Sequence, residues 1–343
     1  MIRTGHPMVL GAVPEVDPAH LPELTDIITA TPQFQSILAQ LPLYAQSDLP
    51  ILLTGEPGTG KELVTRAICA LSHPWRRSCQ RVNCAALTES LACSELFGHV
   101  RGAFTDAYSS RPGKFRLAHG GTLFMDEVGD LPLSIQPRLL RAVEQGEIEP
   151  VGGDAAVKVN VRLVTATNQD LARLIAQGHF RQDLYDRLAV LVVQLPALRE
   201  RPEDIPLLAR HFAQEAARKY GRGLPVKFGF GALTLLQQHS WPGNVRELKN
   251  VITRAVLLSA DGYLRGRDII FLAHPPLAPG SGLAPAPGGA TPRPSRGRLQ
   301  VLLAEENGNI SALSRRLQVC TKTIYRWLRT HRIDLLSIRG AAA

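Results

Sequence analysis

A glycine-rich octapeptide, GEPGTGKE at residues 55–62, has residue types and spacing suited to phosphate binding. Glycines let consecutive backbone N–H groups turn toward phosphate oxygens, and Lys61 adds a cation at the start of a helix. An aliphatic run at 50–53 precedes the octapeptide, and the helix-like stretch LVTRAICALS follows it. Glu62 stands where the generic loop has a Ser or Thr hydroxyl for magnesium. We predict a nucleotide site here; the alternative is a glycine-rich turn without a function.

Two adjacent acids end a second apolar run, LFMDE at residues 123–127. Buried carboxylates are costly without partners, so acids at the end of an apolar strand suggest a ligand. Asp126 is suited to hold magnesium, directly or through water, and Glu127 to polarise an attacking water. The alternative is a strand that merely ends in an acidic turn. Because Lys61 precedes this motif, we favour ATP hydrolysis, with ATP and Mg2+ as cofactors.

Short strands that alternate with helices must position these two motifs. β-Branched and aliphatic runs predict five strands. They are Pro50–Leu53, Gln80–Asn83, Thr122–Met125, Val159–Ala166 and Leu191–Leu195. Their alternation with helices implies an α/β fold, a parallel sheet with helices on both faces. After Pro196 the strand signal stops and residues 203–258 are predicted as helices, so a small helical subdomain follows.

The C-terminal end is predicted to form a separate, smaller domain. The chain has 343 residues, room for about two domains. Residues 275–297 have 12 Gly or Pro in 23 positions and no acid, which predicts a linker. The net charge is +2 over residues 1–274 and +7 over residues 275–343. Clustered cations favour a polyanion partner through counterion release; a solvated basic tail is the alternative.

Composition excludes several classes of protein. Charged residues are 20% and hydrophobic ones 45%, so the bulk of the chain should fold. No apolar run approaches the roughly 20 residues of a membrane helix, and secretion is not expected. Five cysteines, at positions 69, 79, 84, 93 and 320, form no CxxC pair. We expect reduced thiols in a cytoplasmic protein; a metal shared by Cys79, Cys84 and Cys93 is the disfavoured alternative.

The stretch from about Ile27 to Leu258 resembles the AAA+ ATPase domain of bacterial enhancer-binding proteins, the activators of sigma-54 RNA polymerase. Several segments carry the resemblance: GEPGTGKE, VNCAAL, SELFGH, RGAFTDA, GGTLFMDEVGDLP, ATNQDL, FRQDLYDRL, LPALRERPEDIPLLARHF and WPGNVRELKN. This family commonly has Glu at the position of Glu62. The resemblance implies an AAA+ P-loop NTPase core at 27–195 and a helical lid at 196–274, after a short extension at 1–26.

The resemblance also implies roles for residues of the nucleotide site. The nucleotide-binding set is Gly55, Glu56, Pro57, Gly58, Thr59, Gly60, Lys61, Glu62, Asn168 and Arg246. In it Lys61 contacts the β and γ phosphates, Asn168 senses the γ phosphate and Arg246 reports nucleotide state from the lid. Asp126 serves the metal and Glu127 the water. Asn83 resembles a switch residue that holds the catalytic glutamate away from water until the partner is engaged; the alternative is a polar strand end.

Arg181 and Arg187, six residues apart in FRQDLYDR, resemble arginine fingers that reach into the nucleotide of a neighbouring subunit. Fingers supplied by a neighbour imply a homo-oligomeric ring. For this family the ring is a hexamer.

The segment GAFTDA at 102–107 departs from the family signature, GAFTGA. In the family this loop grips the sigma factor with its Phe and Thr, which are Phe104 and Thr105 here. An exposed Phe between small residues fits a contact tip. Asp106 removes glycine's backbone freedom and adds a negative charge at the tip. We therefore expect the sigma-54 contact to persist with altered efficiency.

Residues 298–334 are predicted to form three short amphipathic helices, with turns at 307–308 and 318–320. This region, within a domain at 298–343, resembles the Fis-type helix-turn-helix domain that closes many enhancer-binding proteins. Its third helix would enter the major groove of DNA. The candidate contacts are Lys322, Thr323, Tyr325 and Arg326. A plain three-helix oligomerisation module is the alternative.

These observations predict a DNA-bound AAA+ ATPase that remodels sigma-54 RNA polymerase to permit promoter opening. Only about 26 residues precede the ATPase region, fewer than the roughly 100 of a sensory domain, so no receiver domain is expected in this chain. One alternative is an AAA+ DNA-binding regulator that acts without sigma-54, which Asp106 favours. A non-enzymatic DNA-binding regulator is a second alternative, and the intact Lys61, Glu127 and finger arginines argue against it.

Overall fold

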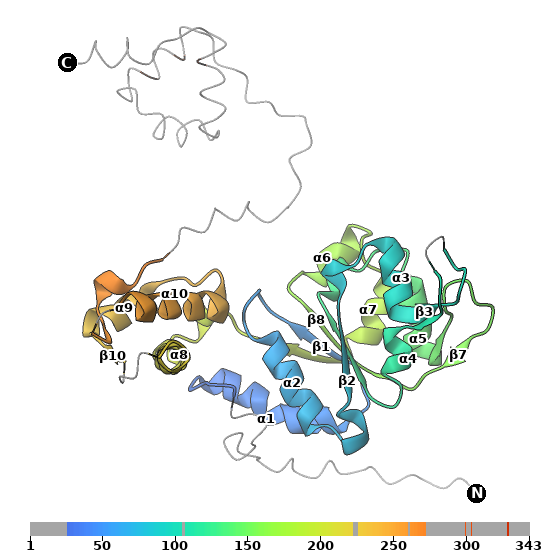
Figure 1. Cartoon of the computed structure of the whole chain (residues 1–343), viewed down its shortest axis with the longest axis horizontal. Helices are drawn as coiled ribbons and strands as arrows, with labels where there is room; N and C mark the ends of the chain where they lie inside the picture. The colour runs from blue at the N-terminus through green and yellow to red at the C-terminus, as the bar shows by residue number, and fades with distance from the viewer. Residues whose placement is uncertain are drawn as a thin grey trace, which may run out of the picture. The chain divides into compact units, whose positions relative to one another are not determined.

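Figure 1 gives the computed structural model of the whole chain. It describes residues 26–104, 107–221, 226–259 and 261–271, together with Leu299, Leu303 and Leu328. The chain divides into two compact units, Met1–Phe271 and Leu272–Ala343. Within the described ranges, no helix has the length and apolar character that a membrane span requires.

The first unit is built on a five-stranded parallel sheet in the order β2-β5-β8-β1-β9. The strands are β1 (Ile51–Thr54), β2 (Cys79–Asn83), β5 (Thr122–Asp126), β8 (Arg162–Thr167) and β9 (Leu191–Gln194). The five predicted strands are thereby confirmed. One begins later than expected, because the N–H of Val159 bonds to the Gly146 carbonyl and ties that residue to the preceding hairpin.

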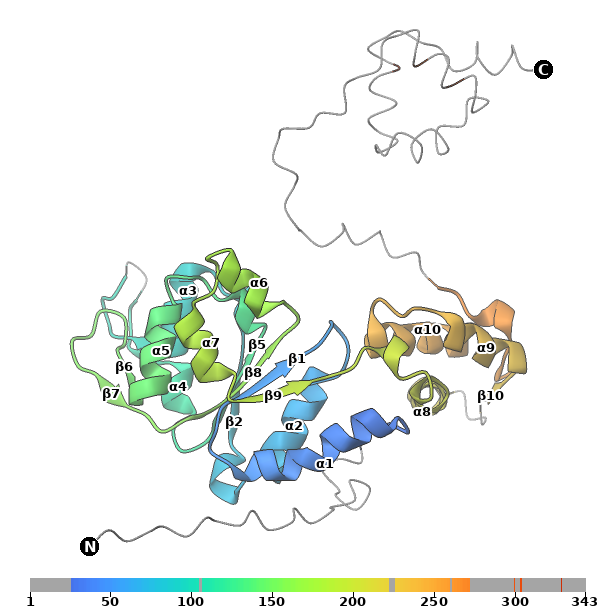
Figure 2. The same cartoon turned by 180° about the vertical axis from the view of Figure 1, so that it is seen from behind.

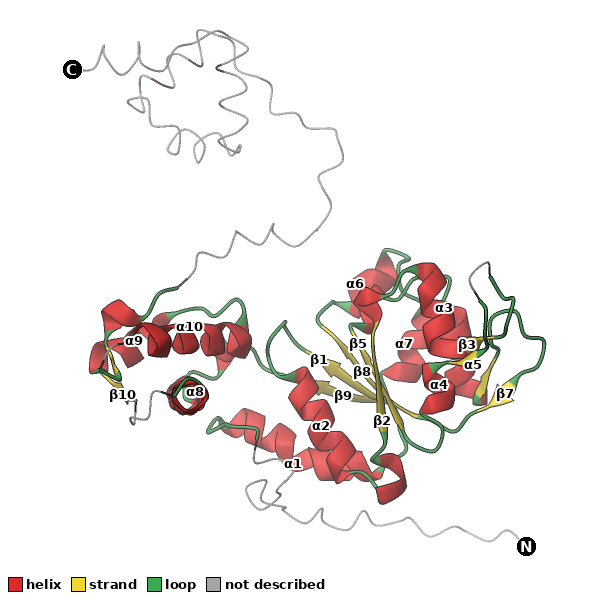
Figure 3. Cartoon of the chain, in the orientation of Figure 1, coloured by secondary structure: helices red, strands yellow, loops and turns green. Residues whose placement is uncertain are grey.

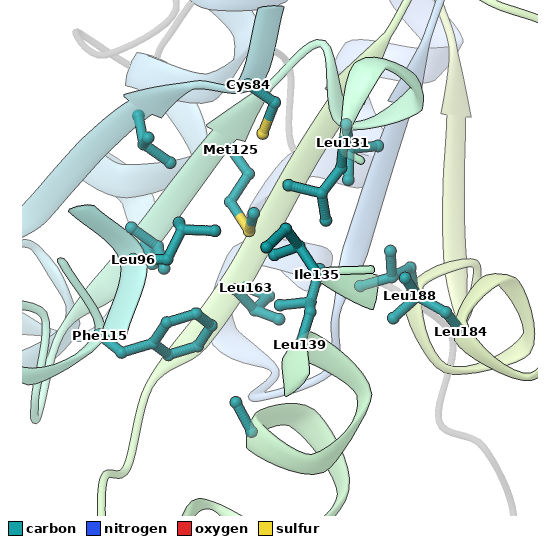
Figure 4. Close-up of a cluster of buried hydrophobic side chains, with 14 of the residues drawn as sticks. Cys84, Leu96, Phe115, Met125, Leu131, Ile135, Leu139, Leu163, Leu184 and Leu188 are labelled. Atoms are coloured by element: carbon teal, nitrogen blue, oxygen red, sulfur yellow. The ribbon is translucent and has the colours of Figure 1, made fainter. Parts of the chain in front are cut away.

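Helices cover both faces of this sheet, as the views from front and behind agree (Figures 1 and 2). One face carries α1 (Pro32–Gln46) and α2 (Lys61–Leu71). The other carries α3 (Glu89–Phe97), α4 (Lys114–Leu117), α5 (Gln136–Gln145), α6 (Leu171–Ala176) and α7 (Gln182–Leu188). Side chains alternate along each strand. Leu123 and Met125 of β5 therefore pack in the cluster that contains residues of α3 and α5, and Phe124 packs in the cluster that contains residues of α1 and α2. Figure 4 shows Met125 in the first of these clusters.

Short connecting elements complete this α/β body. They are the 3-10 turns η3 (Pro74–Arg76), η4 (Cys84–Ala86) and η5 (Val128–Asp130), and two hairpins. The hairpin strands are β3 (Gly98–His99) with β4 (Arg111–Pro112), and β6 (Glu147–Ile148) with β7 (Val157–Lys158). Val151 joins the hairpins, since its N–H bonds to the Gly98 carbonyl and its carbonyl accepts from Val100. The hairpins lie at the end of the body away from the lid helices (Figure 1).

A mostly helical lid follows the last strand (Figure 3). It contains η6 (Leu198–Glu200), α8 (Asp204–Lys219), α9 (Phe230–Gln238), α10 (Asn244–Leu258) and η7 (Gly266–Asp268), with β10 (Lys227–Phe228) beside β11 (Tyr263–Leu264). Trp241 is fully buried in its core and donates from Nε1 to the Leu236 carbonyl at 2.8 Å. The expected helical subdomain is thus confirmed.

Little of the second unit is described. Leu299, Leu303 and Leu328 are helical and buried, as expected for apolar positions of amphipathic helices. The linker at 275–297 and the remainder of the predicted helix-turn-helix lie outside the described residues.

Candidate nucleotide site

The phosphate loop connects β1 to α2, as the sequence predicted. Lys61 is buried, and its Nζ donates to the carbonyls of Gly55 (2.8 Å) and Glu56 (3.4 Å). Gly60 has φ 110°, a left-handed conformation that an L side chain adopts only with strain. The loop therefore brings a cation and the first N–H groups of α2 to one point, which is a favourable site for a phosphate anion.

The two acids lie at the carboxyl end of β5. Asp126 Oδ1 accepts the N–H of Glu127 at 3.1 Å, and Glu127 Oε2 accepts the N–H of Asn168 at 3.0 Å. Strand order explains the second contact, because β8 lies between β5 and β1 and ends at the residue before Asn168. The backbone of Glu127 is in the left-handed region, with φ 52°.

Burial shifts the pKa values of two side chains at this site. It raises the pKa of Glu127, an effect that the Asn168 N–H and the Lys61 ammonium oppose. Burial lowers the pKa of Lys61, although Glu127 and Asp126 oppose that shift. A carboxyl with a raised pKa is a stronger base than an exposed one, which suits it to accept a proton from water.

A cleft of about 350 Å3 lies where these groups meet the lid. The loop and both acids line one side, and Val245, Arg246 and Lys249 of α10 line the other. The structure thus brings together Lys61, Asp126, Glu127 and Arg246, which are far apart in the sequence.

Sequence reasoning missed a second cavity, of about 100 Å3, behind the phosphate loop. Its walls are mainly apolar and include Ile27, Ile28, Phe34, Leu208, Phe212 and Val245. The segment before α1 forms part of these walls and is held by Asp204, which is fully buried. The Asp204 carboxylate accepts hydrogen bonds from Thr29 Oγ1 (2.9 Å) and the Ala30 N–H (2.6 Å). No periodicity in the sequence signals this cavity, because its walls come from four separate segments.

The donor set fits a magnesium nucleotide. Asp126 and Glu62 both line the cleft, and Glu62 pairs with Arg66 and Arg81, each at 2.9 Å. Among the residues described here, no three His, Cys, Asp or Glu side chains gather to hold a metal. Magnesium would therefore take most of its ligands from phosphate and water, as it commonly does beside one or two carboxylates.

Asn83 ends β2, beside the end of β5 that carries Asp126. Its Oδ1 accepts the N–H of Ala85 at 3.0 Å and so caps η4. No hydrogen bond between Asn83 and Glu127 is present in this described part of the chain. The switch role of Asn83 stays a prediction.

Arg181 precedes α7 as its N-cap residue, Arg187 lies in the last turn of α7, and both are exposed. Arg181 pairs with Asp183 at 2.7 Å, and Arg187 with Glu144 at 2.7 Å. Neither lines the cleft of its own chain. Both are free to face another molecule if their ion pairs exchange.

Phe104 lies on the segment between β3 and β4, 45% exposed, with its ring edge-on to His99 at 5.0 Å. The other contact-loop residues, Thr105 and Asp106, lie outside the described residues. So do the predicted DNA contacts Lys322, Thr323, Tyr325 and Arg326.

Comparison with known protein families identifies two matching domains. The sigma-54 interaction domain matches residues 27–194, and the AAA+ ATPase lid domain matches residues 199–274. A crystal structure of NtrX from Brucella abortus in complex with ATP has a TM-score of 0.65 and 32% identity, covering 90% of this chain and 70% of NtrX.

Similar curated proteins are bacterial transcription regulators. The DNA-binding transcriptional activator HyfR of Escherichia coli K12 is 49% identical over 70% of this chain and 36% of its own length. The anaerobic nitric oxide reductase transcription regulator NorR of Aeromonas hydrophila is 40% identical over 94% of this chain and 65% of its own. The transcriptional regulatory protein ZraR of E. coli K12 is 42% identical over 87% of this chain and 67% of its own length. The chain thus spans about one third to two thirds of these relatives.

Proposed function

The chain belongs to the family of sigma-54-dependent transcriptional activators, the bacterial enhancer-binding proteins, and on this premise we propose that it hydrolyses ATP to remodel sigma-54 RNA polymerase. One observation carries the proposal. Lys61, Asp126, Glu127 and Arg246 line a single cleft between the α/β body and the lid. The apolar cavity behind the loop would take the base of ATP.

Each group has a physical task in that reaction. Lys61 and the loop N–H groups would bind phosphate oxygens, and Asp126 would hold Mg2+. Bound Mg2+ supplies charge neutralisation at the phosphates. Glu127 would orient an attacking water and accept its proton. Because the Asn168 N–H holds Glu127, a shift of the predicted γ-phosphate sensor would move this base directly.

The site of one subunit is incomplete in this proposal. Arg181 and Arg187 are exposed on α7 and lie apart from the cleft of their own chain. Supplied by a neighbouring copy, they would stabilise the charge that develops during phosphoryl transfer. The active form is then a homo-oligomer, which we propose to be a hexamer.

Two further surfaces would connect hydrolysis to transcription. The loop with Phe104 would contact sigma-54 at the end of the body away from the lid. The basic C-terminal domain would bind DNA upstream of the promoter, in the cytoplasm. A chain that ends at Gly280 is expected to lose sequence-specific footprints on DNA; if it still protects the same sites, the C-terminal assignment fails.

Capture of sigma-54 tests the proposal. We expect the chain, purified sigma-54, ADP and aluminium fluoride to form a complex that mimics the hydrolysis transition state. Phe104→Ala should abolish the complex and leave ATP hydrolysis within about twofold, because the loop is remote from the phosphates. Tyr108→Ala is the matched control, since Tyr108 is an 81% exposed aromatic of the same segment.

Asp106→Gly should strengthen this complex, because it removes a carboxylate that loses water on contact. If the wild-type chain captures no sigma-54 and Asp106→Gly does not restore capture, the sigma-54 proposal is wrong. The alternative AAA+ regulator, acting without sigma-54, would then take its place.

A further inference from the structure

Three consecutive carbonyl groups of the phosphate loop accept hydrogen bonds from the lid. Asn244 Nδ2 donates to Pro57 (3.1 Å), the Val245 N–H to Gly58 (3.0 Å), and Arg201 to Thr59 (3.0 Å). The two preceding carbonyls accept from Lys61. A donor from the lid thus holds each of the carbonyls of Pro57, Gly58 and Thr59.

Asn244 is the centre of these contacts. It is fully buried, and its left-handed backbone (φ 51°) begins α10. Its Oδ1 accepts the N–H of Leu198 at 2.7 Å, in the segment that leads from β9 into the lid. Its Nδ2 donates to Glu56 Oε2 (3.1 Å) as well as to Pro57. One side chain therefore joins the sheet-to-lid connection, the lid helix and the phosphate loop.

Glu56 extends this junction to a second lid residue. Both of its carboxylate oxygens accept hydrogen bonds from the Arg199 guanidinium, at 2.6 and 2.8 Å. The Arg199 hydrogen bond is the main cause that holds the pKa of Glu56 below its usual value. Glu56 is thus an anion beside a phosphate site, where its own charge would repel the ligand unless a cation pairs with it.

The backbones of loop and lid also approach closely. A Cβ on Gly58 would lie 2.5 Å from the Gly243 carbonyl oxygen, so a side chain there would push the lid away. Gly58 has φ 80° and lines the cleft. This glycine therefore serves the lid contact as well as the phosphate turn.

We propose that Asn244, with the Glu56–Arg199 pair, is a positioning group through which the lid orients the N–H donors of the phosphate loop. The described peptides are all trans, so each carbonyl points opposite to the N–H of the next residue. Because Asn244 and Arg201 hold the carbonyls of Pro57 and Thr59, the N–H groups of Gly58 and Gly60 are directed opposite to these two donors. Both glycines line the cleft. Movement of the lid would then loosen phosphate binding. The inference rests on the proposed nucleotide site and adds its coupling to the lid.

Ligands that differ only in their phosphates test this coupling. We would measure binding of ADP by calorimetry and of adenosine by saturation-transfer NMR, with melting temperatures as a check of folding. Asn244→Asp keeps the acceptor for Leu198 and tolerates the left-handed backbone but loses both donations to the loop. Asn244→Gly accepts the same backbone without any side chain. Both should weaken ADP binding about tenfold and leave adenosine binding within about twofold.

Glu56→Gln is a second, surface variant that preserves folding if Asn244 proves indispensable. It should weaken ADP binding about threefold, because loss of the Arg199 ion pair loosens the loop. Unchanged or tighter ADP binding would mean that the pair does not position the loop and that the Glu56 charge only repels phosphate. Asp261→Asn is the matched control, since Asp261 pairs with Arg265 at 2.6 Å elsewhere on the lid. Asp261→Asn should leave the affinities for ADP and for adenosine unchanged.

The outcomes separate the two levels of the argument. If the wild-type chain binds neither ligand, the proposed nucleotide site fails and the inference fails with it. If the wild-type chain binds ADP and the variants bind it equally well, or lose ADP and adenosine in parallel, the nucleotide site stands and the positioning role is wrong.

Discussion

At the scale of single residues, Glu127 combines three unfavourable features. Its backbone is left-handed (φ 52°), its carboxylate faces Asp126 and Asp130, and burial raises its pKa. Non-glycine residues in this region of φ and ψ are uncommon and cluster at functional sites, where the surroundings hold them. The Asn168 N–H and Lys61 provide part of that support. The strain is consistent with a base selected for chemistry instead of stability.

Glu127→Gln should lower the rate of ATP hydrolysis by about 100-fold or more. It should also raise the melting temperature near neutral pH. A carboxyl whose folded pKa is raised carries its penalty above that pKa, and the penalty disappears once the group is protonated in both states. The gain in melting temperature should therefore shrink as the pH falls toward 4.5, the ordinary value. Melting curves recorded between about pH 4 and about pH 8 check this. A gain independent of pH would contradict the burial argument.

At the scale of elements, four of the five short strands were predictable because each is an apolar run followed by a motif or a helix. The other, β2 (CQRVN), is mainly polar and has only a weak pattern of its own. The lid helices were predictable from their periodicity. The pairing of the two hairpins through Val151 was not, because two-residue strands carry no pattern of their own. The hydrogen bonds between the lid and the phosphate loop were not predictable either. Asn244 forms them from a left-handed backbone, and its partners Glu56 and Pro57 lie nearly two hundred residues earlier in the sequence. The acids were predictable because they lie at the end of an apolar strand, and Lys61 because it ends a glycine-rich loop at the start of a helix.

Packing on the α5 side of the sheet offers a test of the fold. Leu139 of α5 is fully buried among Leu163, Ile135 and Leu184 (Figure 4). Leu139→Ala should lower the free energy of unfolding by about 2–5 kcal/mol, because it leaves a cavity. Leu133→Ala removes the same atoms from a side chain that is 49% exposed and should cost below about 0.5 kcal/mol. Urea unfolding would compare the two; equal shifts would contradict the assigned core.

At the scale of the whole molecule, the proposed function divides the work among separate surfaces. The nucleotide cleft, the finger arginines on α7 and the Phe104 loop occupy different parts of the first unit. Most of the excess positive charge, +7 of +9, lies beyond residue 274. In the proposed function, a second copy would complete the cleft and the C-terminal domain would bind DNA.

Mixing two inactive variants tests the shared site. Glu127→Ala removes the base and Arg181→Ala removes a finger, so each alone should hydrolyse ATP at least about 100-fold more slowly than wild type. A mixture should regain activity where an intact cleft meets an intact finger. The wild-type rate per subunit should also rise with protein concentration. No recovery at any mixing ratio, with a rate per subunit unchanged on dilution, would show that each subunit works alone.

The most direct measurement of the central claim is promoter opening by purified sigma-54 RNA polymerase, followed by permanganate reactivity of unpaired thymines. We expect opening only when the wild-type chain and ATP are both present, and none with Glu127→Gln, which binds ATP without hydrolysing it, or with Phe104→Ala, which hydrolyses ATP without the contact. Hydrolysis by the wild-type chain without any opening, at every protein concentration tested, would contradict the claim and favour an ATPase that acts independently of sigma-54.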